Sequence, residues 1–82
     1  MSVPWPLPQS VLDELAGHAD TYKENVAFPM KLAEQTATLV DGVPVSYHVS
    51  FAQRIDPEGG IQLWVEFELD AAFNIVSEDA YI

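Results

Sequence analysis

Cysteine is absent from this chain, which excludes disulfide bonds and thiolate chemistry. Basic residues are scarce: three Lys and Arg stand against thirteen Asp and Glu, for a formal net charge of -10 at pH 7. Such a chain repels phosphates and anionic lipids, so we expect no direct binding to nucleic acid or membrane. The charge either attracts a basic partner or only keeps an acidic protein in solution.

Long apolar segments are also missing. No stretch approaches the ~20 apolar residues of a membrane helix, and residues 1–10 lack the basic and apolar parts of a signal peptide. We therefore expect a cytoplasmic protein, from a bacterium or a phage-infected cell. The 82 residues predict a single domain over 1–82, whose thin core leaves little room for an enzyme-sized cleft.

Residues 1–9 are predicted to form a proline-rich extended arm within that domain. Pro4, Pro6 and Pro8 alternate with apolar residues, a pattern typical of an extended chain. We expect Trp5 to fold back over an open edge of the protein's own core. The alternative is that the arm docks in a groove of another protein.

A helix is predicted from Ser10, which precedes an apolar run and has Asp13 three residues on, close to a capping box. We expect this helix to end near residue 24 or 25, since Pro29 blocks its continuation. Its buried stripe follows three- and four-residue spacing: Leu12, Leu15, Ala16, Ala19 and Tyr22.

Residues 26–36 are compatible with either helix or strand. Their second half is rich in β-branched residues and leads into Asp41-Gly42, a dipeptide that favours a two-residue hairpin. We therefore predict a strand over about 31–40. The following strand, from Val43, shows a clear alternation of apolar and polar residues.

Two more strands are predicted, over residues 61–70 and in the C-terminal segment "IVSEDAYI", where the alternation is broken and a bulge is expected. The sum is an α+β fold in which one N-terminal helix packs on a four-stranded antiparallel meander. This order of elements resembles the helix-on-sheet layout of cystatin-like folds, as an architectural analogy.

Trp64 is the exception in the alternating segment 61–70, because it falls on the polar side. With a symmetric turn at 56–60, Trp64 lies opposite Ala52, and Glu68 lies opposite His48. All four side chains would then point away from the helix. This pairing predicts a large aromatic side chain on the outward face of the sheet.

The last strand has two alternative registers. One places Glu78 beside Glu66, and the other places Asp79 beside Glu66 and Tyr81 beside Trp64. Either register sets two acids side by side, which destabilises a sheet. The predicted partner-binding surface comprises Trp64, Glu66, Glu68, Glu78, Asp79 and His48.

An aromatic side chain ringed by charges is typical of a contact hot spot. We therefore predict a non-catalytic acidic protein that docks on a basic partner surface, such as an inhibitor, an antitoxin or immunity protein, or a phage-encoded antagonist. In the last case carboxylates would take the place of nucleic-acid phosphates. The alternatives are a self-associating structural protein or homodimer, a small ligand-binding or enzymatic domain, or an aromatic residue covered by the arm or without function.

Catalytic and metal sites are weakly indicated. His48 and Glu68 form a candidate acid–base pair, although such pairs are usually surface ion pairs. His48, Glu66 and Glu68 offer too few converging ligands for a metal. No nucleophile motif or phosphate-binding glycine loop is present. We expect no enzyme activity, no cofactor and no metal.

Overall fold

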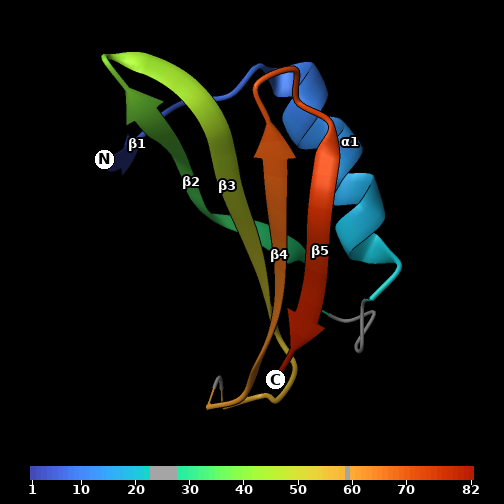
Figure 1. Ribbon diagram of the computed structural model, residues 1–82. Helices are drawn as coiled ribbons and strands as arrows, with labels where there is room; N and C mark the ends of the chain where they lie inside the picture. The colour runs from blue at the N-terminus through green and yellow to red at the C-terminus, as the bar shows by residue number, and fades with distance from the viewer. Residues whose placement is uncertain (23–27, 59) are drawn as a thin grey trace.

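The computed structural model describes residues 1–22, 28–58 and 60–82, which form an α+β fold with one helix and one antiparallel sheet (Figure 1). The predicted fold class is confirmed, but the prediction of four strands is wrong because the N-terminal arm supplies a fifth. The elements, in chain order, are β1 (Ser2–Pro4), α1 (Gln9–Asp20), β2 (Met30–Val40), β3 (Val43–Arg54), β4 (Gln62–Asp70) and β5 (Ile75–Tyr81), and the strands pair in that order.

The arm is bound to the edge of the sheet. Val3 of β1 pairs with Ala37 of β2, and beyond β1 two further backbone N–H groups bind Gln35: that of Trp5 donates to its backbone oxygen at 3.2 Å and that of Leu7 to its side-chain oxygen at 3.0 Å. Leu7 is buried, and Trp5 packs against the core. The prediction that Trp5 folds back over the protein's own core is therefore confirmed.

Helix α1 differs from its prediction at both ends. It begins at Gln9 with Pro8 as the cap residue, and no side chain caps it, so the capping role predicted for Ser10 is wrong. Gln9 instead donates a side-chain hydrogen bond to Asp13. The helix ends at Asp20, whereas residues 24 and 25, its predicted end, lie outside the described residues. The predicted stripe is confirmed: Leu15 and Ala19 are buried, and Leu12, Ala16 and Tyr22 pack beside them.

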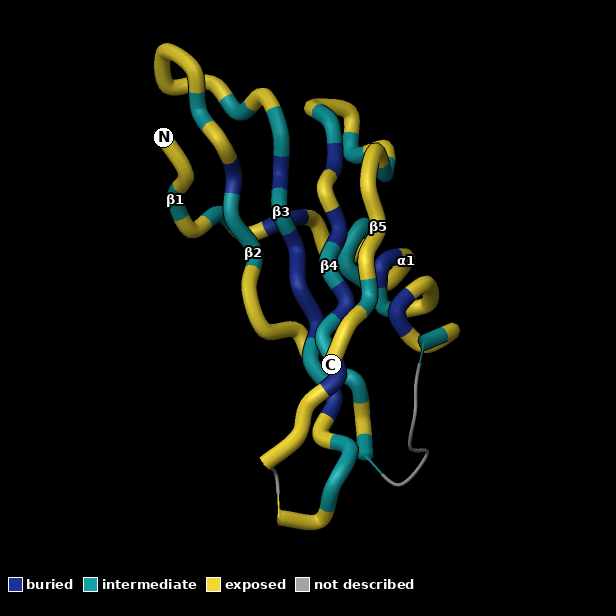
Figure 2. Tube along the Cα trace, turned by 60° about the horizontal axis from the view of Figure 1, so that its bottom comes forward, coloured by how far each residue is buried: buried dark blue, intermediate teal, exposed yellow. Residues whose placement is uncertain are grey.

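The core lies between α1 and one face of the sheet, here called the inner face. Most of the buried residues, dark blue along the trace in Figure 2, belong to the two strands β3 and β4. The ring of His18 on α1 lies 6.4 Å from that of Phe67 on β4, centroid to centroid. The inner-face core of β3 and β4 comprises Tyr47, Val49, Phe51, Leu63, Val65, Phe67 and Leu69.

The turn between β2 and β3 has the predicted hairpin geometry. Asp41 and Gly42 both have positive φ, 52° and 78°, as the twist-matched two-residue turn requires. The ambiguous segment before it is a strand from Met30 onward, and residues 26 and 27 lie outside the described residues. The strand predicted over about 31–40 is therefore confirmed.

The turn between β4 and β5 is organised by Asp70. One carboxylate oxygen accepts the backbone N–H groups of Ala72 and Asn74, each at 2.9 Å, and the other accepts the Asn74 side-chain amide at 3.1 Å. The hydrogen bonds from Asn74 hold the pKa of Asp70 below its ordinary value. After this turn, β5 runs antiparallel to β4.

Among the residues described, no helix combines the length and apolar character needed to cross a membrane.

Candidate protein-binding surface

The pairing of β3 with β4 is the one predicted from the sequence. Trp64 lies opposite Ala52, and Glu68 opposite His48. Their neighbours along each strand are buried in the core, so these four side chains point to the other face, here called the outward face. The predicted outward position of Trp64, Glu68 and His48 is therefore confirmed.

The register of β5 decides between the two predicted alternatives. Asp79 pairs with Glu66 and Tyr81 with Trp64, after an irregularity opposite Glu68 and Leu69 that fits the predicted bulge. Asp79 therefore joins the outward face. Tyr81 also lies there and belongs to the candidate surface, although the sequence-based set omits it; the second register was the signal that pointed to it.

Glu78 does not belong to this surface. It pairs with the core residue Phe67, so its side chain lies on the inner side, where it accepts a hydrogen bond from the Tyr22 hydroxyl at 2.5 Å and lies 3.8 Å from Nδ1 of His18. The prediction of Glu78 as an outward partner-binding residue is wrong, because the extra residue in β5 shifts the alternation by one. Glu78 instead links β5 to Tyr22 and His18 on the helix side of the sheet.

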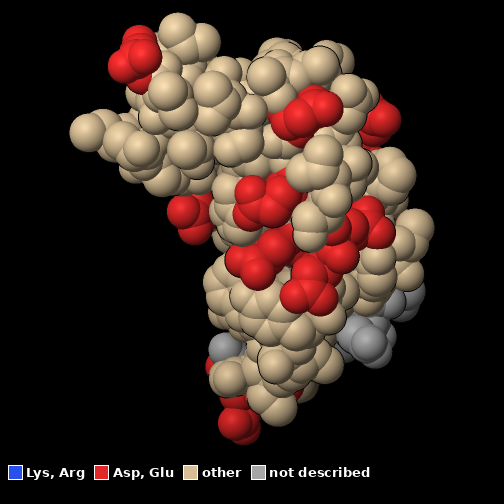
Figure 3. Space-filling view, in the orientation of Figure 1, with Lys and Arg blue, Asp and Glu red and all other residues tan. Residues whose placement is uncertain are grey.

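The remaining acids form a cluster around His48. Its Nδ1 lies 2.5 Å from a carboxylate oxygen of Glu68, and its Nε2 lies 3.4 Å from one of Glu66. Asp79 stands beside Glu66 on the next strand, about 5 Å away by ordinary strand spacing. Figure 3 shows Asp and Glu gathered at the centre of this face, with no Lys or Arg of the described residues in view.

Trp64 lies half-buried at the border of this cluster. Ala52 and Tyr81 flank it on the neighbouring strands, and it lines a shallow hollow together with Ile61 and Ile82, both of which are exposed. The ring is thus partly covered by its neighbours rather than fully bare. It offers an apolar contact next to negative groups.

Tyr81 extends the aromatic part of the surface. Its side chain is 45% exposed, and its pKa is raised, first by partial desolvation and then by its hydrogen bond to Glu66 and the negative charge of Asp79. The hydroxyl therefore stays protonated and acts as a hydrogen-bond donor. Trp64 and Tyr81 together provide two aromatic side chains on adjacent strands.

The alternative that the N-terminal arm covers Trp64 is wrong. Strand β1 is bound to β2 at one edge of the sheet, whereas Trp64 lies on β4 and is flanked by β3 and β5. The arm and Trp64 are therefore separated by two strands. The aromatic pair is left open to a partner.

The acid pair Glu66–Asp79 is expected to destabilise the free protein. Because like charges directly opposite on a sheet repel, Asp79→Asn should raise the free energy of unfolding by ~0.2–1 kcal/mol at low salt. The gain should shrink in high salt, where the repulsion is screened. Urea unfolding at two salt concentrations measures both effects. Glu58→Gln, in an exposed turn, is the control and should change little; an Asp79→Asn variant no more stable than the native chain at low salt would contradict the repulsion.

By register, two basic residues that the sequence analysis did not single out continue the outward side past Trp64, outside the view of Figure 3. Lys31 pairs with Ala52, and Ala52 with Trp64, so all three point to the same side of the sheet. Arg54 follows on β3 with the same orientation, opposite Gln62. A strand beginning at residue 30 or 31 was the signal that could have placed Lys31 here.

The described residues hold no group of three or more His, Cys, Asp or Glu that could bind a metal ion. His18 lies on the inner side near Glu78 and is not part of the cluster around His48. Comparison with protein-family models, curated proteins and solved structures finds no match for this chain. The function is therefore inferred from the surface itself.

Proposed function

We propose that this chain is a non-catalytic binding protein whose outward face on β3, β4 and β5 docks on a basic surface of a partner macromolecule. One observation carries the proposal: Trp64 and Tyr81 stand side by side, next to Glu66 and Asp79 on the same two strands. An aromatic anchor with polar groups at its rim is how binding energy is commonly concentrated at protein interfaces.

The side chains of this surface project from hydrogen-bonded strands, so their positions are fixed before a partner binds, and this favours tight binding. Each of these side chains projects from a residue paired on both sides or from the last paired positions of β5, so little conformational freedom of the backbone is lost on docking. The side-by-side acids Glu66 and Asp79 repel each other in the free protein. A basic partner would relieve that repulsion, and it would also be steered toward a chain of charge -10.

The chemistry suits an inhibitor, an antitoxin or immunity protein, or a phage-encoded antagonist. Partners that handle nucleic acid are favoured because their binding sites are basic, and carboxylates on neighbouring strands can occupy positions meant for phosphates. Nucleic acid and this protein would then compete for one site. The cystatin-like order of elements stays an analogy and adds nothing to the choice of partner.

The test is capture of partners from a lysate of the producing cells by the immobilised protein. Trp64→Ala removes the anchor and Glu66→Lys reverses a central charge; each should lower capture of the specific partner about tenfold or more. Glu14→Lys, an exposed position on α1, makes the same charge change on the other side of the sheet and is the matched control. Circular dichroism confirms that all variants are folded.

Three results separate the possibilities. Loss of capture in Trp64→Ala and Glu66→Lys but not in Glu14→Lys supports the surface, and release of the captured protein by duplex DNA supports competition with nucleic acid. Equal capture by all variants would show that binding, if any, uses another surface.

Self-association is the competing interpretation, because β5 is an edge strand. Pairing of two β5 strands would bring Glu78 and Asp79 of both copies together, which disfavours it at neutral pH. Light scattering at low and high salt distinguishes the two: a species that stays monomeric when the repulsion is screened excludes the homodimer.

A further inference from the structure

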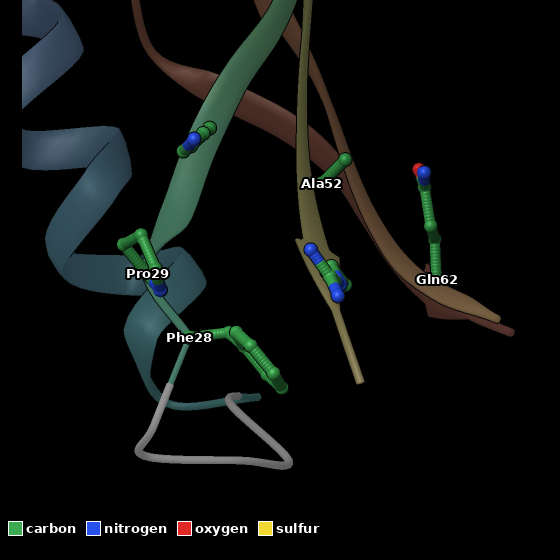
Figure 4. A pocket seen from close by; sticks show the side chains of 6 residues that line it. Phe28, Pro29, Ala52 and Gln62 are labelled. Carbon is green, nitrogen blue, oxygen red and sulfur yellow. The ribbon is translucent and has the colours of Figure 1, made fainter. Parts of the chain in front are cut away.

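A second candidate site lies at the end of the sheet where β2 begins and β3 ends. It is a pocket of about 280 Å³, seen from close by in Figure 4. Three neighbouring strands and the two residues before β2 contribute to it. Its lining residues are Phe28, Pro29, Lys31, Ala52, Arg54 and Gln62.

The pocket gathers two of the chain's three basic residues. Within the described residues, Lys31 and Arg54 make no ion pair, although the chain has thirteen carboxylate side chains. Two cations placed together without an anion repel each other, so a bound anion would remove that cost as well as gain attraction. The pair is therefore the feature of the pocket that indicates a ligand.

Arg54 is oriented before any ligand binds. Its Nε donates to the backbone oxygen of Asp56 at 3.0 Å, and its guanidinium carbon lies 5.1 Å from the centroid of the Phe28 ring. A cation–π contact of this kind, together with the hydrogen bond, limits the movement of the guanidinium. The two terminal nitrogens then present a fork that matches the two oxygens of a carboxylate.

The rest of the lining is largely apolar and small. Phe28 and Pro29 supply one wall, and Ala52, which lies between Lys31 and Trp64 in the register, leaves space that a larger side chain would fill. Gln62 adds an amide that donates or accepts. A volume near 280 Å³ falls at the small end of ligand sites, enough for one ring and its charged group.

The backbone at Phe28 is tied to the sheet. The side chain of Gln53, which is fully buried, donates to the Phe28 carbonyl at 2.9 Å. The position of Phe28 therefore depends on a hydrogen bond from the buried side chain of Gln53. The site is built from three strands and one anchored residue, and does not rely on a lone surface charge.

We propose that this pocket binds a small organic anion: a carboxylate carried on a flat apolar group. Arg54 and Lys31 hold the carboxylate, and the apolar part lies between Phe28 and Ala52. This site adjoins the Trp64 end of the docking surface, since Ala52 pairs with Trp64 and Gln62 lines both hollows. It takes a ligand of the opposite charge preference, and its test does not depend on the proposed function.

Benzoate is the probe, followed by NMR chemical-shift titration of the full chain. Benzoate should shift the signals of the lining residues in a saturable way, and benzamide, of the same shape but neutral, should bind about tenfold or more weakly. Lys31→Gln should weaken benzoate binding by a similar factor. Arg54→Lys, which keeps the charge but loses the fork, should also weaken it.

Ser10→Asp is the control, since this exposed position on α1 lowers the net charge by one unit, as Lys31→Gln does, away from the pocket. Its benzoate affinity should match that of the native chain. Three results would overturn the proposal: no saturable shift, equal binding of benzoate and benzamide, or equal loss in Ser10→Asp and Lys31→Gln. Inorganic phosphate binding more tightly than benzoate would overturn the ligand class.

Discussion

Replacing Phe67 with alanine is expected to lower the free energy of unfolding by about 3–5 kcal/mol. A domain of this size has a total stability near the low end of the usual ~5–15 kcal/mol. The variant should therefore be largely unfolded at 37 °C, with a loss of about 12–40 °C in the midpoint of thermal unfolding.

The size of this effect follows from the position of the ring. Phe67 is completely buried and is the largest of the fully buried side chains. Its ring lies 6.0 Å from that of Phe51 in an edge-on arrangement and 6.4 Å from that of His18. It thus contacts both the neighbouring strand and the helix, and its removal leaves a cavity where α1 meets the sheet.

Thermal and urea unfolding followed by circular dichroism measure the loss. Val76→Ala is the control, because Val76 is 65% exposed on the same strand pair and should change stability by no more than ~0.5 kcal/mol. Equal stability of Phe67→Ala and Val76→Ala would contradict the position of the core.

The central sheet was predictable because its alternation is strict where the inner sides of both strands are buried. A shift of the pairing between β3 and β4 by one residue would turn the apolar side chains of one strand to the opposite face. The apolar residues alone therefore predict that Ala52 pairs with Trp64 and His48 with Glu68. The outward position of Trp64, unusual for an aromatic residue, was therefore predicted without any functional motif.

The edges of the sheet were less predictable. In β5 an extra residue near Val76 moves Glu78 to the inner side, and nothing in "IVSEDAYI" fixes where that residue lies. At the other edge, prolines usually argue against a strand. Here the residues between Pro4, Pro6 and Pro8 still have N–H groups that can donate. Those of Trp5 and Leu7 donate hydrogen bonds to Gln35.

Pockets formed by several strands are the hardest feature to predict from sequence. Lys31 and Arg54 are far apart in the chain, and they converge only because β2 begins at Met30 and pairs with the end of β3. From the sequence, residues 26–36, which include Lys31, were compatible with helix as well as strand. The strand predicted over about 31–40 was not paired with the end of the next strand, so the two cations were not placed together.

Gln53 should contribute to both the stability of the fold and the shape of that pocket. It interrupts the apolar residues on the inner side of β3, yet it is fully buried. Its amide donates to the carbonyl of Phe28, and burial of an amide without such a partner is costly. A polar residue at an inner position is thus explained by the segment that it holds.

Gln53→Leu keeps the approximate volume and removes the hydrogen-bonding amide, so the free energy of unfolding should fall by ~1–3 kcal/mol. Benzoate should also bind more weakly to this variant, because Phe28 is no longer held over the pocket. Gln9→Leu, at an exposed helix position, removes a side-chain hydrogen bond to Asp13 instead and should leave benzoate binding unchanged. If Gln53→Leu matched the native chain in urea unfolding and in benzoate titration, the Gln53 amide would have no role in positioning Phe28, and the pocket would owe its shape to the strands alone.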